Sequence, residues 1–411
     1  MSELDGVPGW QRNLYILAAA QFLSALGFSF VQPFFPLYIQ ELGVSNPGLS
    51  AFWAGVTTFA GGIGSFITGP IWGTLADRYG RRPMVIRSML GGAITVGLMG
   101  LVPSVGFLVL LRGLQGIFTG TIAASSALAA SQAPKRRVAF ALGLIQMAFF
   151  LGITGGPLVG GVLADATGHR IPFLLTAVLI TGGALVVVFF VRERFVPPPE
   201  GSRRPGPIEN VRTVLRVQNI LPLLGLLLLM RFGPAMITPI FSVFMQDMVA
   251  EGAASIAGVG FGLVGLMSAV AALTVARIGR WETMRLAIIV SCFAAAVFYF
   301  PQFWVHSPAL AVVLFGLTGI SQGVLLTTTN ALMSVSVSRE HQGAVFGVVQ
   351  SVNALAFGLG PLLGGILGAT LGFGSVFMAD AALFLLVGVA AWLLLSRRAT
   401  FAEETAHRPA Q

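Results

Sequence analysis

Long apolar runs separated by short polar turns make up almost the whole chain. A helix needs about 20 apolar residues to cross the hydrocarbon of a bilayer. Backbone exposed to lipid must be helical or closed into a barrel, and a barrel is marked by short alternating segments rather than continuous runs. The pattern therefore predicts an all-α integral membrane protein. Its twelve spans lie at roughly 12–38, 49–76, 83–102, 105–131, 137–164, 170–191, 220–247, 255–276, 283–301, 308–335, 341–369 and 374–396.

The composition agrees with a membrane protein and excludes several other classes. Only 9% of the 411 residues are charged and 55% are apolar, whereas a soluble domain averages about 25% charged residues. The net charge of +9 does not indicate a nucleic-acid partner, because the arginines lie between apolar runs rather than on one solvated face. Cys292 is the single cysteine and the four histidines are scattered, so we expect no metal site. No Walker motif is present, so we expect neither ATP use nor an enzyme.

Basic residues predict the orientation in the membrane. Of the 24 Lys and Arg, 21 fall on one side of the predicted spans, the opposite loops hold only Arg170, and Arg112 and Arg231 lie within spans. Lys and Arg concentrate in cytoplasmic loops. We therefore expect a multi-pass protein of the inner or plasma membrane with both termini in the cytoplasm.

The chain divides into two similar halves. The stretch 192–219 is rich in Pro and Arg, which is typical of a flexible linker. It separates a six-span domain at 1–191 from another at 220–397, followed by a tail at 398–411. Residues 152–161 in span 5 match 356–365 in span 11, 204 positions later. Parallel six-span repeats are the arrangement of one large class of secondary transporters, so we expect two pseudo-symmetric bundles.

Five stretches carry a family resemblance. Residues 73–83 resemble the loop 2–3 signature of the major facilitator superfamily, and 111–116 resemble its span 4 motif. Residues 152–161 resemble the span 5 motif of its drug/proton antiporter branch. Within that branch, 10–14 and 33–44 resemble the MdtG type of multidrug-resistance proteins. The resemblance implies two halves that rock about a central cavity and export drug-like or amphipathic molecules, driven by the proton motive force without a cofactor.

The loop between spans 2 and 3 holds one acid among several arginines. Asp77 could be part of a topological anchor, with an exposed ion pair that contributes little. The resemblance implies a latch instead, in which this acid reaches the N-terminus of span 11 in the outward-facing state. A carboxylate there is favoured by about 0.3–1 kcal/mol. The repeat has Ala276 in place of the acid, so the sequence predicts a single latch. Its residues are Gly73, Asp77, Arg78, Gly80, Arg81 and Arg82.

Small residues in spans 5 and 11 predict a close contact. Glycines at helical spacing let two backbones approach, and a proline permits a bend. We expect this surface to be the moving interface between the halves. Its residues are Gly152, Gly156, Pro157, Gly160, Gly161, Gly360, Pro361 and Gly364.

Three charged residues, Arg112, Arg231 and Asp380, are singled out as charges within the membrane, where an unpaired charge is costly. Arg112 is a candidate for proton coupling by resemblance, with a purely structural hydrogen bond as an equal alternative. Arg231 and Asp380 either neutralise each other as a buried pair or act separately. In the second case Arg231 would bind an anionic substrate group and Asp380 would carry protons.

Amides and aromatic residues complete the predicted substrate cavity, although buried amides also bond neighbouring helices. The candidates are Gln21, Phe28, Gln32, Gln115, Gln146, Phe149, Arg231, Gln322, Asn330, Gln350, Asn353 and Phe357. No acid lies in the body of spans 1, 4, 5, 7 or 10, which argues against a dedicated cation site.

The most consistent function is proton-coupled export of small molecules by a monomer in the lipid bilayer. One alternative is a facilitator, or an exporter of sugars or organic anions, without proton antiport. Another is a non-transporting membrane receptor or scaffold built on the same fold.

Overall fold

The computed structural model describes residues 9–118, 120–193, 195, 220–249, 251–276, 281–335 and 342–406, and every regular element in these ranges is a helix. The first half contains α1 (Trp10–Phe30), η1 (Gln32–Phe34), α2 (Phe35–Glu41), α3 (Pro47–Tyr79), α4 (Arg81–Met99), α5 (Val105–Phe118), α6 (Thr121–Gln132), η2 (Lys135–Arg137), α7 (Val138–Thr167) and α8 (Arg170–Phe190). The second half contains α10 (Ile220–Ile237), α11 (Phe241–Gln246), α12 (Ala253–Ala276), α13 (Trp281–Tyr299), η3 (Phe300–Phe303), α14 (Pro308–Val335), α15 (Gln342–Leu371) and α16 (Phe373–Ala406).

Each of the twelve predicted spans corresponds to one helix or to consecutive helices. Within the described ranges, 11 stretches are long and apolar enough to cross a membrane. The remaining span is α4, a 19-residue helix whose hydropathy is lowered by Arg81, Arg82 and Arg87. The predicted all-α membrane fold is confirmed. The predicted domain boundaries stay a prediction, because 196–219 lie outside the described residues.

Three spans predicted as continuous are interrupted. Span 1 changes direction at η1, which contains Pro33, and span 7 breaks into turns at 238–240, which contain Pro239. Proline has no N–H to continue the helix ladder. Span 4 is divided between α5 and α6, where Gly120 has φ 121°, a conformation that favours glycine.

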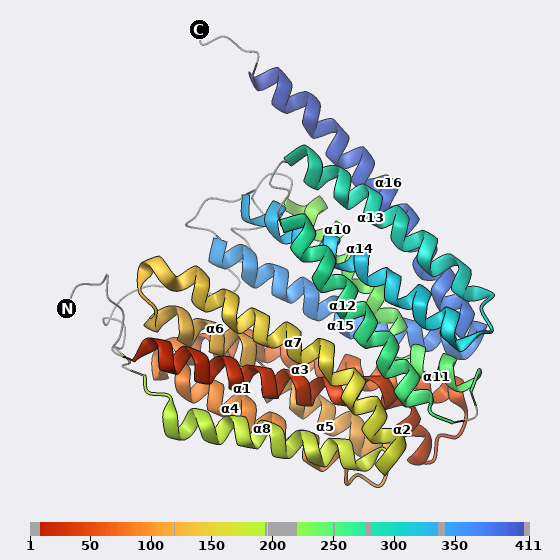
Figure 1. Cartoon of the computed structure of the whole chain (residues 1–411), viewed down its shortest axis with the longest axis horizontal. Helices are drawn as coiled ribbons and strands as arrows, with labels where there is room; N and C mark the ends of the chain where they lie inside the picture. The colour runs from red at the N-terminus through yellow and green to blue at the C-terminus, as the bar shows by residue number, and fades with distance from the viewer. Residues whose placement is uncertain are drawn as a thin grey trace.

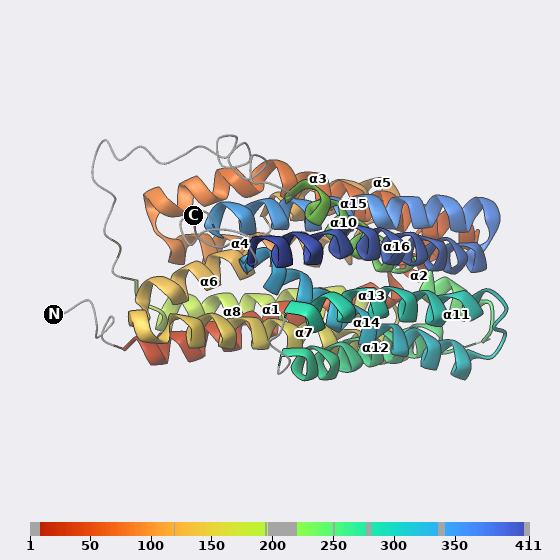
Figure 2. The same ribbon diagram turned by 90° about the horizontal axis from the view of Figure 1, so that it is seen from above.

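The two halves pack in the same way. In the first half α1 packs on α7 and α8, α3 on α5, and α4 on α8. In the second half the equivalent helices repeat this scheme, with α10 on α15 and α16, α12 on α14, and α13 on α16. Between the halves, α3 runs along α15 and α7 runs along α12, as Figure 2 shows from above. We call these contacts the first seam (α3–α15) and the second seam (α7–α12). The predicted pseudo-symmetry is therefore confirmed.

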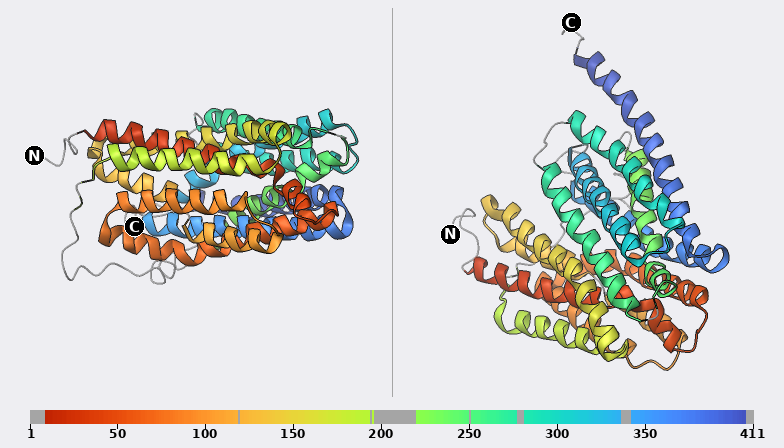
Figure 3. Two further views of the ribbon diagram at one scale, coloured as in Figure 1. Left: turned by 90° about the horizontal axis from the view of Figure 1, so that it is seen from below. Right: turned by 45° about the vertical axis from the view of Figure 1, so that its right-hand side comes forward.

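The apolar core is shared at one end of the molecule only. One cluster joins both halves and includes Tyr38 of α2 and Phe244 of α11. At the opposite end the core separates into a cluster of first-half residues around Leu17 and another of second-half residues around Leu224. The ribbons accordingly converge at α2 and α11 and diverge toward the end where both termini lie (Figures 1 and 3). We call these the closed end and the open end.

Candidate functional site

The first seam is a contact between backbones. A Cβ added to Gly55 of α3 would collide with the Pro361 carbonyl of α15, and one added to Gly365 would lie 2.7 Å from the Ala51 carbonyl oxygen. Farther toward the open end, a Cβ on Gly62 would lie 3.0 Å from the Gly358 Cα. The glycines therefore let two long helices from different halves slide or tilt with almost no side chain between them.

The second seam repeats this chemistry on the other side of the molecule. A Cβ on Gly258 of α12 would meet the Pro157 carbonyl of α7, and one on Gly161 of α7 would meet the Ala254 carbonyl of α12. In both seams, then, a proline carbonyl of span 5 or 11 faces a glycine of the opposite half. This symmetry is the structural counterpart of the sequence repeat.

The span 5 and span 11 motifs serve two contacts, not the single interface that we predicted. Gly152, Gly156 and Gly160 all face α1 of their own half; a Cβ on Gly152 would lie 2.6 Å from the Ala25 Cβ. The second-half residues Gly360 and Gly364 likewise face α10 of their own half. Of the eight residues assigned to the moving interface, Pro157, Gly161 and Pro361 face the opposite half. Residues four apart share a helix face, so one motif can present two adjacent small-residue faces to two different helices.

Polar contacts reinforce the closed end. Gln40 of α2 and Gln246 of α11 exchange two amide hydrogen bonds, at 2.8 and 3.0 Å. The Asp165 carboxylate at the end of α7 accepts from the Ser255 N–H of α12 at 2.7 Å. Sequence reasoning missed these residues. A signal existed for the glutamines, because 35–40 and 241–246 both begin with Phe and end with Gln at equivalent positions.

The loop 2–3 motif is anchored by an acid that the sequence reading did not single out. Gly80 has φ 97° and leaves room for Glu193, whose carboxylate accepts from the backbone N–H groups of Arg81 and Arg82 at 2.9 and 2.7 Å. The Arg82 guanidinium donates to the Val188 carbonyl at 2.5 Å. Glu193 thereby satisfies the free donors of the first turn of α4. A lone acid between two arginines at the end of span 6 was the available signal.

The remaining latch residues cannot be placed as the prediction requires. Arg78 is exposed, with its guanidinium 5.5 Å from the centroid of the Tyr79 ring. The surroundings of Gly73 in α3 and the side chain of Asp77 are outside what the structure describes, as are residues 336–341 before α15. The latch on span 11 therefore stays a prediction.

Arg112 lies in a packed contact between spans 1, 2 and 4. Its side chain lies against Gly61 of α3, and its guanidinium is 5.5 Å from the Phe35 ring centroid. It donates to the Gln115 side-chain oxygen at 2.6 Å, and Gln115 is buried. Arg112 thus makes the hydrogen bond that a structural role requires.

Asp380 is a buried acid without a hydrogen-bond partner in the described part of the chain. It is 0% exposed, and both carboxyl oxygens are unbonded. The side chain points at α10, where a Cβ on Gly233 would collide with it and would lie 3.1 Å from the Phe384 ring. The Tyr299 ring stacks on Phe384, with centroids 5.8 Å apart. The Tyr299 hydroxyl in turn accepts from Gln322 at 3.2 Å.

Arg231 and Asp380 do not form the ion pair that the sequence left open, since no salt bridge joins these two described residues. Arg231 belongs to α10 itself, and Asp380 of α16 packs against a different face of that helix. Gly233 faces α16, Met230 faces α14 through a 3.8 Å contact with Thr329, and Met236 faces α15. The helical period places Arg231 on the remaining face, where it is half-buried.

The other cavity candidates are divided between the bundle interior and exposed surface. Gln21 is buried within the first half, and Phe28 packs on Gly92 of α4. Exposed positions are Gln32, Gln146 and Phe357, whereas Phe149, Gln322 and Asn353 are half-buried. The side chains of Asn330 and Gln350 lie outside the described residues.

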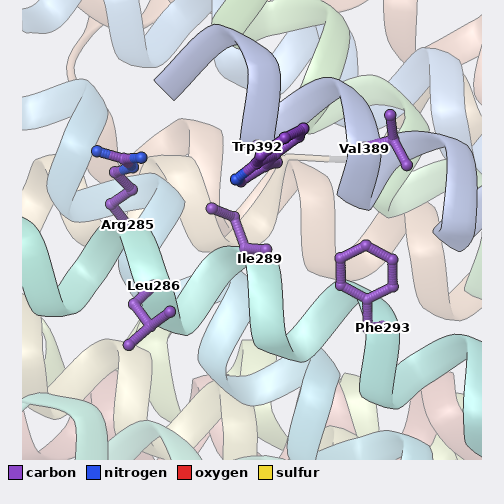
Figure 4. Close-up of a pocket in the computed structure, with 6 residues that line it drawn as sticks. All are labelled: Arg285, Leu286, Ile289, Phe293, Val389 and Trp392. Carbon is purple, nitrogen blue, oxygen red and sulfur yellow. The ribbon is translucent and has the colours of Figure 1, made fainter. Parts of the chain in front are cut away.

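A pocket of about 520 Å³ lies away from both seams, between α13 and α16. Figure 4 shows its lining by Arg285, Leu286, Ile289, Phe293, Val389 and Trp392. No predicted cavity residue lines it. These two helices form the edge of the second half farthest from the first (Figure 1), so the pocket is not on a path between the halves.

Two bundles with the same internal packing, joined along two seams of small residues, have the architecture of a class of secondary transporters. A profile of the Major Facilitator Superfamily matches residues 17–317 and 283–410. The chain belongs to this superfamily, and the resemblance read from its motifs is confirmed. It is accordingly a transporter and not an enzyme. Members of the superfamily generally need no cofactor, and the described residues include no group of three or more His, Cys, Asp or Glu that could hold a metal.

Relatives sharpen this assignment. Multidrug resistance protein MdtG of Dickeya zeae (strain Ech586) is 32% identical over 394 residues, which cover 95% of this chain and 96% of the relative. The MdtG protein of Citrobacter koseri is 33% identical over 408 residues, covering 97% and 98%.

Solved structures share the fold at lower identity. A bacterial homologue of the human lysosomal transporter Spinster, inward-facing and occupied, has a TM-score of 0.75 at 15% identity and covers 94% of this chain and 97% of its own. The human organic anion transporter MFSD10 has a TM-score of 0.68 at 19% identity, covering 93% and 99%.

Proposed function

We propose that this chain is a multidrug exporter that couples efflux to proton entry by alternating access. The observation that carries the proposal is the unequal contact between the halves. They share an apolar core at the closed end, have separate cores at the open end, and meet along two seams of small residues. Halves joined in this way can rock about the seams and open at either end in turn.

The relatives support the substrate class. Two proteins named for multidrug resistance match nearly the whole chain at 32% and 33% identity. The exposed candidates Gln146 and Phe357 offer an amide and an aromatic ring, which suits amphipathic molecules of varied shape. Arg231 is half-buried with no ion pair among the described residues, and this favours organic anions as a second candidate substrate class.

The proton is assigned to Asp380. A fully buried carboxylate without hydrogen-bond donors would carry an uncompensated charge, which costs several kcal/mol. A bound proton would remove this cost. Movement of α16 against α10 would change this environment and release the proton.

The orientation follows from the basic residues. The bias of Lys and Arg predicts that the end carrying both termini faces the cytoplasm. The described conformation is then open to the cytoplasm, where it can take up substrate from inside the cell. The transporter would act as a monomer in the inner membrane. The Asp77 latch would act when the molecule closes this end and opens the other.

Inverted membrane vesicles test the proposal. Adding a drug to vesicles that hold a pH gradient should dissipate part of the gradient with the wild-type protein. Asp380→Asn should still bind the drug but leave the gradient at the level of vesicles without transporter. Asp247→Asn, which changes an acid exposed at the closed end, serves as the matched control and should behave as wild type.

The possible results separate the parts of the proposal. Drug flux in the wild type that ignores the gradient would contradict antiport and favour the facilitator. If the Asp380→Asn variant still dissipated the pH gradient when drug was added, the assignment of the proton to this residue alone would be contradicted. Absence of flux for every drug and organic anion offered would favour the receptor or scaffold.

A further inference from the structure

Asp165 joins the two halves at the closed end by a bond to a helix terminus. It lies in the last turn of α7, and Ser255 is the third residue of α12 in the opposite half. The first N–H groups of a helix have no partner within the helix, and they attract negative charge. The Asp165 carboxylate satisfies one of these N–H groups at 2.7 Å. Gly252, which precedes the helix, has no side chain with which to do so.

The corresponding place on the first seam is built differently. The position equivalent to Asp165, 204 residues later in α15, is Ala369. The N-terminus of α3 is capped by its own neighbour, because the Asn46 side-chain oxygen accepts from the Leu49 N–H at 2.9 Å. At the first seam, the N-terminus of α3 is therefore capped by a residue of its own half. At the second seam, the N-terminus of α12 is capped by Asp165 of the opposite half.

We propose that Asp165 is the latch of the closed end. Its bond to α12 crosses between the halves, so it exists only while that end is shut and must break before the end opens. The bond therefore biases the equilibrium toward the conformation open at the other end. This inference rests on the proposed alternating access, and it gives the transport cycle a specific positioning residue.

The latch does not act alone. The reciprocal amide pair of Gln40 and Gln246 also crosses between the halves at this end. That pair joins equivalent residues of the two repeats, whereas Asp165 has no equivalent. The carboxylate is exposed, so the bond is screened by water and weak enough to break in every cycle. A strong buried pair at the same place would lock the molecule.

Spin labels on the other seam measure the latch without touching it. Leu49 of α3 and Leu371 of α15 are exposed at the closed end, on opposite halves. Labels on Leu49→Cys and Leu371→Cys should give a short distance when the end is shut and a long distance when it is open. Asp165→Ala should raise the ratio of long to short distances about two- to fivefold. Asp165→Asn keeps an oxygen acceptor without the charge and should lie between the two.

Controls separate the latch from general stability and from the cycle itself. Asp247→Ala, another exposed acid at the same end, should leave the ratio unchanged. A merely structural role for Asp165 would lower the melting temperature without moving the ratio, and that result would overturn the latch. The latch would also be overturned if the wild type showed both distances and the ratio of long to short distances were unchanged in both Asp165 variants. A single wild-type distance, with and without drug and gradient, would instead overturn alternating access.

Discussion

The two halves bury their charges in different ways although their helices pack alike. In the first half, the Arg112 guanidinium has a partner, because it donates to Gln115 at 2.6 Å. In the second half, Asp380 has no hydrogen-bond partner among the described residues. Gln322, which occupies the position equivalent to Gln115, donates instead to the Tyr299 hydroxyl at 3.2 Å. One inherited amide therefore holds a cation in place in one half and a tyrosine near the acid in the other.

This difference separates two roles that a duplicated fold could otherwise share. A cation with a fixed partner keeps its charge throughout a cycle, whereas a buried acid without a partner is stable only in its protonated form. We therefore expect changes around Asp380 to affect proton coupling, and changes around Arg112 to affect stability first.

The largest effect is expected from Gly233→Ala, which places a methyl group where the Asp380 carboxyl lies. Overpacking of this kind costs about 1–3 kcal/mol of stability. Displacement of the acid should also reduce drug efflux to the background of a pump-deficient host. Growth on drug and thermal unfolding in detergent measure the two effects.

Gly225→Ala is the matched control on the same helix, because nothing lies within 4 Å of a Cβ at that position. It should export as wild type does. If Gly233→Ala also exported normally, the acid would have room to move and the comparison between the halves would fail.

A smaller effect on export is expected from Arg112→Ala. A hydrogen bond to a charged group contributes about 1.5–3 kcal/mol, so the melting temperature should fall while the number of protons moved per drug stays constant. Arg78→Ala removes an exposed arginine and should change the stability by no more than about 0.5 kcal/mol. Normal stability with lost coupling in Arg112→Ala would instead place this residue in proton transfer, the alternative that the sequence left open.

The smallest effect is expected from Gln322→Leu. Losing the bond to the Tyr299 hydroxyl should cost about 0.5–1.5 kcal/mol. A double-mutant cycle with Tyr299→Phe measures this pair directly, and its interaction energy should fall in the same range. Independent effects of the two substitutions would show that the amide does not position the tyrosine.

The hydropathy pattern predicted the helices well because lipid imposes a minimum apolar length on every span. Even α4, which three arginines make less apolar, lies where 83–102 was predicted. The breaks at Pro33 and Pro239 were missed because an apolar run does not record a change of direction. The two faces of the span 5 motif were merged for a similar reason. Glycines at 152 and 161 look alike in a sequence, and only the rotation of the helix assigns them to α1 or to α12.

The contacts that join distant parts of the chain were the hardest to predict. Asp165 and Ser255 are 90 residues apart, and Glu193 lies more than 100 residues from the N–H groups that it binds. These acids lie at helix ends, where hydropathy carries no signal, and their partners are backbone groups that every residue type possesses. Asp380 was found from the sequence because a charge inside an apolar run stands out. Whether Asp380 pairs with Arg231 depends on the rotation of the helices, so the absence of this ion pair among the described residues was not predictable from the sequence.

The side chain at 380 and the residue at 233 compete for the same space. With the acid placed as it is here, a Cβ at 233 would overlap the carboxyl group. Homologous genes that retain the acid should therefore retain the glycine, and genes that have lost the acid are free to encode a larger residue there. The residues at 233 and 380 in newly sequenced genomes would therefore distinguish transporters that keep the buried acid from those that have replaced it, before any of the proteins is expressed.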